Sequence, residues 1–294
     1  MPELPDIITY QEAMRERIAG HVLEKVRLRT PFLLRSVEPP LSAAEGRRVE
    51  AVERIGKRLA IGFEGDLWLV VHLMIAGRLH WKPRDAKIGS KVSLAAFDFD
   101  TGSLTLTEAG TKRRASLHVG GDRIGLLQFN RGGLDIFTAT VQGFGERLRA
   151  GNHTLKRALT DPRAFDGIGN AYSDEILHDA RLSPLRLTRQ LEDDDIARLF
   201  ASCRSVLSLW IDRMRTQRNG DFPEKVTAFR PEMAVHGRFG LPCPVCSSPV
   251  QRIRYADNET NYCARCQTGG RLLADRAMSR LLKQDWPRSL DDLD

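Results

Sequence analysis

The chain has 294 residues, a formal net charge of +7 at pH 7 and an isoelectric point of about 9.4. This basic balance favours a polyanionic partner, and DNA, RNA or an anionic membrane would each satisfy it. No run of 18 or more apolar residues is present, which excludes a transmembrane helix, and the first residues do not form a signal peptide. We therefore expect a cytoplasmic protein, associated with the nucleoid if it is bacterial.

The chain begins Met-Pro-Glu-Leu-Pro-Asp. Met1 precedes a small residue, so we expect it to be removed, which leaves Pro2 with a free secondary amine. Such an amine titrates near about pH 7.7–8, and its neutral form attacks carbonyl carbons to give an iminium. Glu3 beside it is suited to proton transfer. The alternative is that Pro2 is only a start residue and that Pro5 opens a helix.

Apolar residues recur at helical spacing between residues 5 and 20, which predicts a first helix. From about 21 to 138 the period changes to two, which is typical of strands, as at Leu104 to Thr107. Residues 59–63 and 67–73 flank Glu-Gly-Asp and indicate a hairpin with a strongly buried strand. This segment is therefore predicted to be a β-sandwich.

From about residue 140 the pattern becomes helical. Two short helices are predicted at 155–159 and 172–182, and a longer one at 193–215, where Cys203 is one position of an apolar stripe. Residues 217–235 indicate a loop, and 271–282 a last helix before a loose acidic end.

Two cysteine pairs give the strongest single signal for chemistry. Cys243 and Cys246 are separated by two residues, as are Cys263 and Cys266, and sixteen residues lie between the pairs. Two such knuckles supply four thiolates for one tetrahedral zinc, with no open position for water. The alternative, a redox dithiol, needs only one pair. We therefore expect a structural zinc held by a β-hairpin.

A turn with the sequence Gly-Ile-Gly-Asn occupies residues 167–170, between the two short predicted helices. Backbone amides that open a helix, together with the helix dipole, form an anion site suited to a phosphate. Lys156 lies upstream and Asn170 is placed to donate to the same phosphate. We therefore expect both residues to contact DNA.

These features together resemble the formamidopyrimidine-DNA glycosylase/endonuclease VIII family of DNA repair enzymes, from Met1 to about Gln267. The family opens Met-Pro-Glu-(Leu or Gly)-Pro-Glu and carries its catalytic lysine in a turn like that around Lys57. Its helix–two-turn–helix signature resembles residues 155–177, and its finger ends Cys-x-x-Cys-Gln, as residues 263–267 do.

The resemblance implies a bifunctional DNA glycosylase and AP lyase of base excision repair, which flips a damaged base out of the duplex. Pro2 would attack the sugar C1′ and expel the base, and successive β- and δ-eliminations would release both flanking phosphates. Glu3 would move protons, although it also stabilises the dipole of a helix N-terminus. Lys57 would bind a backbone phosphate; the alternative is a solvated hairpin charge.

Three departures from the family pattern affect the expected contacts with the lesion. The methionine that fills the gap left by the flipped base is matched by Ile75, with Met74 one place early. Arg113 keeps the family's arginine, whereas Ala115 stands at the aromatic wedge. Asn258 stands where the finger has its phosphate-binding arginine, for which nearby arginines at 252, 254 or 265 are candidate substitutes.

The sequence therefore predicts a multidomain α+β protein. We expect a catalytic β-sandwich with an N-terminal helix at 1–138, a helix–two-turn–helix domain at 139–235, a β-hairpin zinc finger at 236–270 and an extension at 271–294. We expect it to be a monomer that binds damaged DNA and no membrane. The alternatives are a damaged-DNA-binding protein with weak or no glycosylase activity, favoured by the altered wedge, and a zinc-ribbon protein of RNA or ribosomes.

Overall fold

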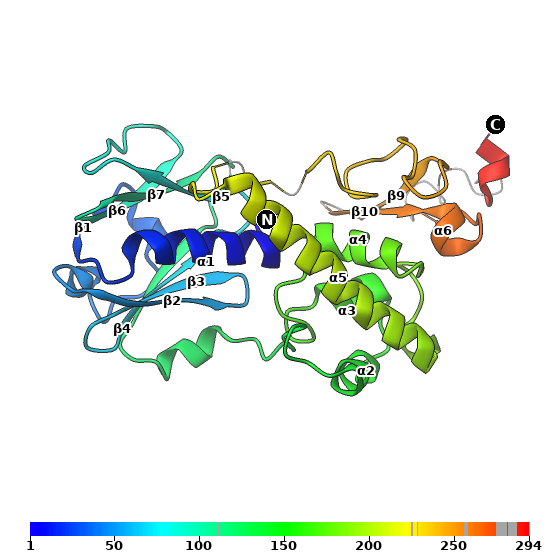
Figure 1. The fold of residues 1–294 in the computed structure, drawn as a ribbon, viewed down its shortest axis with the longest axis horizontal. Helices are drawn as coiled ribbons and strands as arrows, with labels where there is room; N and C mark the ends of the chain where they lie inside the picture. Colours follow the sequence, from blue (N-terminus) through cyan, green and yellow to red (C-terminus); the bar gives the residue numbers. More distant parts are fainter. Residues whose placement is uncertain are drawn as a thin grey trace. The chain divides into compact units, whose positions relative to one another are not determined.

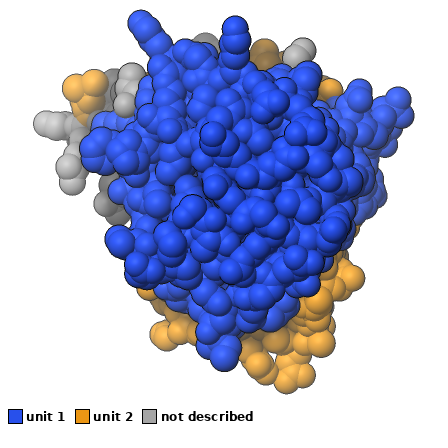
Figure 2. All heavy atoms as spheres, turned by 90° about the vertical axis from the view of Figure 1, so that its left-hand side faces the viewer, with its two compact units in different colours: residues 1–131, 210–227 blue, residues 132–209, 228–294 orange. Residues whose placement is uncertain are grey.

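The computed structural model describes residues 1–110, 112–224, 226–227, 229–255, 258–274, 281 and 287–293. It divides the chain into two compact units (Figure 2). Unit 1 contains residues 1–131 and 210–227, and unit 2 contains residues 132–209 and 228–294. Residues 210–227 thus belong with the N-terminal part of the chain, although more than 70 residues separate them from it. The division into four sequence domains stays a prediction.

Unit 1 begins with the predicted helix, α1 (Leu4–Ile18), and contains two antiparallel four-stranded sheets (Figure 1). One sheet has the order β1-β6-β7-β5 and the other β2-β3-β4-β8. The strands are β1 (Leu23–Leu28), β2 (Val49–Ile55), β3 (Arg58–Phe63), β4 (Leu67–His72), β5 (Gly77–Lys82), β6 (Ser93–Phe99), β7 (Gly102–Glu108) and β8 (Ser116–Gly120).

Both sheets contribute to one hydrophobic core, which makes unit 1 the predicted sandwich. Phe97 and Leu104 enter this core from one sheet and Ile61 and Leu69 from the other. Strands β3 and β4 are buried on both faces, since Phe129 and its neighbours in the η3 segment (Gly125–Phe129) cover their outer side. This explains why the hairpin has a nearly continuous apolar sequence rather than an alternating one.

Unit 2 combines short helices with a β-hairpin (Figure 1). Its helices are α2 (Val141–Arg149), α3 (Leu155–Thr160), α4 (Asn170–Asp179) and α6 (Ala264–Thr268), and its strands are β9 (Val250–Tyr255) and β10 (Asn258–Cys263). Helix α5 (Asp193–Arg218) contributes its first 17 residues to this unit. Helices α3 and α4 match the predicted pair, and strand β10 packs against α4.

The long helix and the loop after it agree with their predictions in type. Helix α5 ends three residues beyond the predicted 215, and Cys203 lies fully buried in its apolar stripe. Most of the helix predicted at 271–282 lies outside the described residues. Among the residues that the structure describes, no helix is both long and apolar enough to cross a membrane.

Candidate active site, DNA-contacting surface and metal centre

The start of the chain is buried although it precedes the first helical residue. Pro2 is buried and Glu3, the N-cap of α1, is 3% exposed, while the Asp6 carboxylate accepts a hydrogen bond from the Glu3 N–H at 2.9 Å. Desolvation lowers the pKa of the Met1 α-amino group from its usual 8.0, while the charge of Glu3 opposes this shift. The surroundings therefore favour a neutral, nucleophilic amine at the chain start.

Lys57 lies in a two-residue turn between β2 and β3, where Ile55 pairs with Arg58. Gly56 has φ +61°, a conformation that glycine adopts without strain and that closes tight hairpins. The positive charge of Lys57 also lowers the pKa of the Met1 amine. The structure therefore brings the sequence-predicted Pro2, Glu3 and Lys57 into one electrostatic neighbourhood within unit 1.

A group of one arginine and two histidines on the outer face of β3, β4 and β8 was missed in the sequence. Arg58 pairs with His72 across β3 and β4, and His118 stands on the same face because it pairs with Val70. Phe129 packs over this face, with the Arg58 guanidinium 5.8 Å and the His118 ring 4.9 Å from its ring centre. Only the register of strands that are distant in sequence reveals this group.

Burial and nearby positive charge keep the two histidines of this face in their neutral form. Burial, followed by the charges of Arg58 and Lys57, lowers the pKa of His72 to about 4. Burial and Arg58 likewise lower the pKa of His118. The buried Nε of Arg58 and Nδ1 of His118 have no hydrogen-bond partner within the described part of the chain. The lowered pKa values leave both histidines mostly neutral at pH 7, so Arg58 supplies the positive charge of this face.

The turn after β4 displays the candidate wedge residue. Ile75 is 59% exposed at the tip of this turn, and Met74 before it is half-buried with φ +53°. Gly77 ends the turn, and a Cβ atom there would lie 2.2 Å from the Leu73 carbonyl oxygen. Only glycine therefore fits at position 77, and the tight turn leaves Ile75 projecting.

The other two candidate lesion contacts differ in exposure. Arg113 is exposed and donates from Nη2 to the Lys91 carbonyl at 2.5 Å. Ala115 is 4% exposed and belongs to the core of unit 1, and its N–H donates to Glu108. Position 115 therefore points into the sandwich, and no aromatic wedge projects from it.

In unit 2, the N-terminus of α4 holds Asn170 against the finger hairpin, since its Nδ2 donates to the Glu259 carbonyl at 2.9 Å. Lys156 donates to the Asn170 carbonyl at 2.6 Å and to Asp174 Oδ1 at 2.5 Å, with its side chain 12% exposed. Its ammonium group thus neutralises a buried carboxylate. The Lys156 side chain is therefore paired within unit 2, and its contact with a DNA phosphate stays a prediction.

Two buried acids on α4 form hydrogen bonds with residues 234–236, the segment that precedes the finger. Glu175 accepts hydrogen bonds from the backbone N–H groups of residues 234, 235 and 236 at 2.7–2.9 Å. Asp174 Oδ2 lies 2.8 Å from the His236 ring and accepts from the Asn261 N–H at 3.1 Å. Burial raises the pKa of Glu175. The only signal for these contacts in the sequence is the presence of two adjacent acids next to the apolar pair Ile176 and Leu177.

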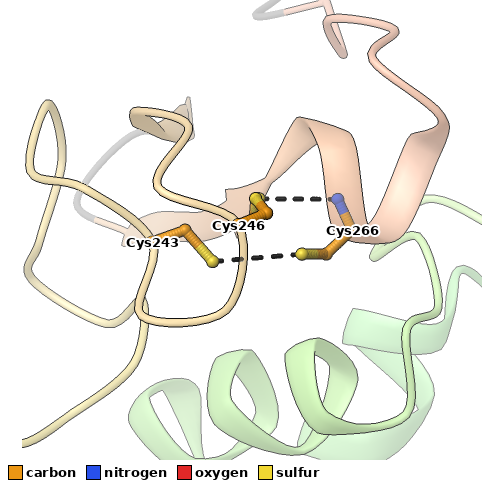
Figure 3. A group of neighbouring side chains, drawn as sticks. Cys243, Cys246 and Cys266 are labelled. Carbon is orange, nitrogen blue, oxygen red and sulfur yellow. Dashed lines mark hydrogen bonds between the residues drawn. The ribbon is translucent and has the colours of Figure 1, made fainter.

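The four paired cysteines converge on one point, and their sulfur atoms all lie within 4.8 Å of one another. Figure 3 shows three of them, Cys243, Cys246 and Cys266. The Sγ atoms of Cys243 and Cys266 are 3.9 Å apart, and those of Cys246 and Cys263 are 3.3 Å apart. A zinc tetrahedron with bonds of about 2.3 Å requires sulfur–sulfur distances of about 3.8 Å. The donor set therefore fits one structural zinc, and Cys203 is not part of it.

The hairpin between the cysteine pairs presents the candidate finger contacts. Asn258 begins β10 and is exposed. Arg252 lies over the Phe239 ring at 4.0 Å, whereas the Arg254 side chain is 63% exposed; each is 3.5 Å from Glu259. Of these two arginines, Arg254 is the more accessible to a ligand. Arg265 lies on α6, beyond the hairpin.

A β-sandwich with a buried amine terminus, a helical pair with an amide-opened turn and a four-cysteine finger together define a modular zinc-containing DNA-repair protein. Family models for the formamidopyrimidine-DNA glycosylase N-terminal domain, the corresponding H2TH domain and the zinc finger found in FPG and IleRS match residues 1–116, 136–219 and 240–269. The chain belongs to the formamidopyrimidine-DNA glycosylase family, which acts in base excision repair.

Similarity to individual relatives extends over most of the chain. The formamidopyrimidine-DNA glycosylase of Heliobacterium modesticaldum is 34% identical, and the alignment covers 91% of this chain and all of the relative. The crystal structure of MutM (Fpg) from Thermus thermophilus is 32% identical, with a TM-score of 0.76, and covers 90% of this chain and 98% of its own. A complex of Lactococcus lactis Fpg with abasic-site DNA is 23% identical and shares the fold, with a TM-score of 0.80. The match covers 90% of this chain and 99% of that one.

Proposed function

We propose that this protein is a bifunctional DNA glycosylase and AP lyase that uses the amine of Pro2, exposed after removal of Met1. The observation that carries this proposal is the buried chain start, where Glu3 adjoins an amine whose pKa is lowered by desolvation and by Lys57. A protein that only bound DNA would have no use for a buried neutral amine beside a carboxylate.

The proposed reaction follows from these groups. The Pro2 nitrogen bonds to the sugar C1′ as the bond from C1′ to the damaged base breaks, and the base leaves with the proton that the nitrogen gives up. The ring oxygen then takes a second proton and opens to give an iminium. Loss of a C2′ proton then expels the 3′ phosphate, and a second elimination expels the 5′ phosphate. Water finally hydrolyses the iminium and restores the amine. In this proposal Glu3 donates and accepts the protons.

We propose that each unit contributes residues that contact the DNA. In unit 1 we propose Lys57 together with the face that carries Arg58, His72 and His118, with Ile75 and Arg113 at the gap left by the flipped base. In unit 2 we propose the N-terminus of α4 with Asn170, and the finger hairpin with Arg254 and Asn258. The ligands of the Lactococcus lactis structures, abasic-site and Fapy-dG DNA, support damaged DNA as the substrate class.

Borohydride trapping on abasic-site DNA tests the proposal, because reduction fixes an iminium covalently. We expect trapping with the mature chain, much weaker trapping with Pro2→Gly, and none when Met1 is retained. Lys57→Met should reduce the rate, whereas Lys25→Met, a matched change at an exposed lysine of β1, should not. Undiminished trapping with Met1 retained would show that a lysine is the nucleophile.

The burial of Ala115 favours a second candidate, a binder of damaged DNA with weak or no glycosylase activity. Without an aromatic wedge, the protein would recognise DNA that is already distorted. The same experiment separates the two functions. Tight binding to abasic-site DNA without trapping or strand cleavage would favour the binder.

A further inference from the structure

A buried histidine of α4 reaches the zinc centre. His178 is 6% exposed, and its Nε2 atom lies 3.3 Å from the Sγ atom of Cys243, which is itself 1% exposed. Sixty-five residues separate the two in sequence, and both belong to unit 2. Neither the cysteine pattern nor the helix pattern of the sequence predicts this contact.

The geometry identifies His178 as a hydrogen-bond donor to the metal site and not as a ligand. The group of possible metal ligands contains the four cysteine sulfurs and not the His178 ring. Four sulfurs already complete a tetrahedron around zinc. A zinc-bound cysteine has lost its proton, so its sulfur can only accept. The proton between the two atoms therefore belongs to Nε2.

His178 is also the last of three contacts that one face of α4 makes with the finger. Asn170, Asp174 and His178 are four residues apart and therefore lie along the same face of the helix. Asn170 bonds the Glu259 carbonyl, Asp174 accepts from the Asn261 N–H, and His178 reaches Cys243. The first two contacts hold the hairpin, and the third involves the metal ligand itself.

We propose that His178 is a positioning residue that donates an N–H···S hydrogen bond to the zinc-bound Cys243 thiolate. The bond withdraws negative charge from this sulfur, which makes it a weaker nucleophile towards electrophiles and fixes its orientation toward zinc. It also fastens the metal centre to the helix whose N-terminus is proposed to bind phosphate. This role goes beyond the proposed function and does not depend on any catalytic activity.

Nuclear magnetic resonance provides the direct test. The full-length protein is loaded with the NMR-active isotope of cadmium, which replaces zinc in thiolate sites, and proton–cadmium correlations are recorded. We expect a cross-peak between cadmium and the His178 ring N–H, transmitted through the hydrogen bond. The backbone N–H of Cys266, 3.5 Å from Cys263 Sγ, provides an internal reference. A cross-peak from Cys266 without one from His178 would overturn the proposal.

Substitution separates the hydrogen bond from packing. His178→Phe keeps a ring of similar size but has no donor, whereas His178→Gln keeps an N–H donor. We expect His178→Phe to weaken zinc affinity about 10- to 100-fold in competition with a chelator, and to speed alkylation of Cys243 by iodoacetamide. His178→Gln should restore most of both properties. His153→Phe, at an exposed histidine of the same unit, is the matched control and should change neither.

The variants have clear contrary outcomes. If His178→Phe retained zinc and resisted alkylation as well as the original protein, the hydrogen bond would have no influence on the metal site. If His178→Gln and His178→Phe were equally impaired while circular dichroism remained unchanged, ring packing and not the donated proton would be the contribution of His178. Either result would refute the proposal.

Discussion

At the chain start, burial and charge act in opposite directions on one amine. Desolvation lowers the pKa of the Met1 amine and Glu3 raises it, while Arg78 adds to the lowering. After removal of Met1, the Pro2 amine would occupy the same buried surroundings one residue further along. These surroundings would lower the pKa of the Pro2 amine and so raise its neutral fraction, chiefly through burial.

Arg78→Met should move the acid limb of the pH–trapping profile to higher pH. Removing this cation raises the pKa of the amine, so a higher pH is needed for the same fraction of neutral amine. Borohydride trapping rates measured from pH 5 to 9 would give the midpoint. Arg84→Met, at an arginine of the same unit that is paired with Glu24, is the control and should leave the midpoint in place.

The expected substrate preference depends on the residues that fill the gap left in the base stack when a base is flipped out. Ile75 is exposed but β-branched, and Ala115 lies in the core, so in the proposed DNA complex a flipped base would leave a poorly filled gap. An aromatic wedge is worth about 1–3 kcal/mol of stacking. We therefore expect single-turnover rates on abasic or single-stranded lesions at least about tenfold above those on duplex 8-oxoguanine opposite cytosine. Equal rates would show that the wedge is unimportant.

Helix α4 organises unit 2 through polar contacts instead of apolar packing alone. Its residues between 170 and 178 contact α3, the segment 234–236, the finger hairpin and a cysteine. Buried polar groups that are fully bonded specify one arrangement, because every alternative leaves a donor or carboxylate unpaired. The helix therefore fixes where the finger begins.

Glu175→Ala should release the segment that precedes the finger. Three backbone N–H groups would lose their acceptor, each at a cost of about 1–3 kcal/mol if it stays buried. We expect faster hydrogen–deuterium exchange at residues 234–236 and a lower melting temperature. Glu146→Ala on the exposed surface of α2 is the control. Unchanged exchange at residues 234–236 would contradict the structural role of Glu175.

The sequence predicted those elements whose signal is local. The apolar repeat of α1, the β3–β4 hairpin and the two cysteine pairs each follow from residues close together in the chain. The contacts of Asp174, Glu175 and His178 span 59 to 87 residues, and no periodicity encodes them. Likewise, only the fold shows Asp174 beside Lys156, whose contact with a DNA phosphate stays a prediction.

For the whole molecule, zinc removal should affect the two units differently. Zinc binding to finger peptides is worth about 10–16 kcal/mol, far more than the small apolar cluster around Ile253 and Tyr262 can supply. Chelation, or Cys263→Ser, should therefore abolish metal content and most DNA affinity while the sandwich core of unit 1 stays folded. Metal analysis and near-ultraviolet circular dichroism would measure both. Full zinc content in Cys263→Ser would contradict the assignment, and Cys203→Ala should retain zinc.

The net charge of +7 predicts a strong salt dependence of DNA binding. Each phosphate neutralised releases counterions, so the logarithm of affinity falls by about 0.9 per phosphate for each tenfold rise in salt. Lys57→Met should reduce this slope by the amount expected for about one phosphate contact. It should also weaken binding to all sequences equally. Fluorescence anisotropy over a salt series would test it. A loss that varied with base sequence would place Lys57 in a groove.

The position of residues 210–227 in unit 1 has a consequence for protein synthesis. Phe222 and Val226 belong to the core of the sandwich, and Phe222 packs beside Tyr10 with ring centres 5.7 Å apart. A ribosome that has made the first 131 residues has made every strand of the sandwich but not these core residues. At about 5–20 residues per second, the nascent sandwich waits roughly 5–20 s for its last pieces. During that interval an unfinished apolar surface is open to chaperones, which makes the order of translation part of how this enzyme reaches its fold.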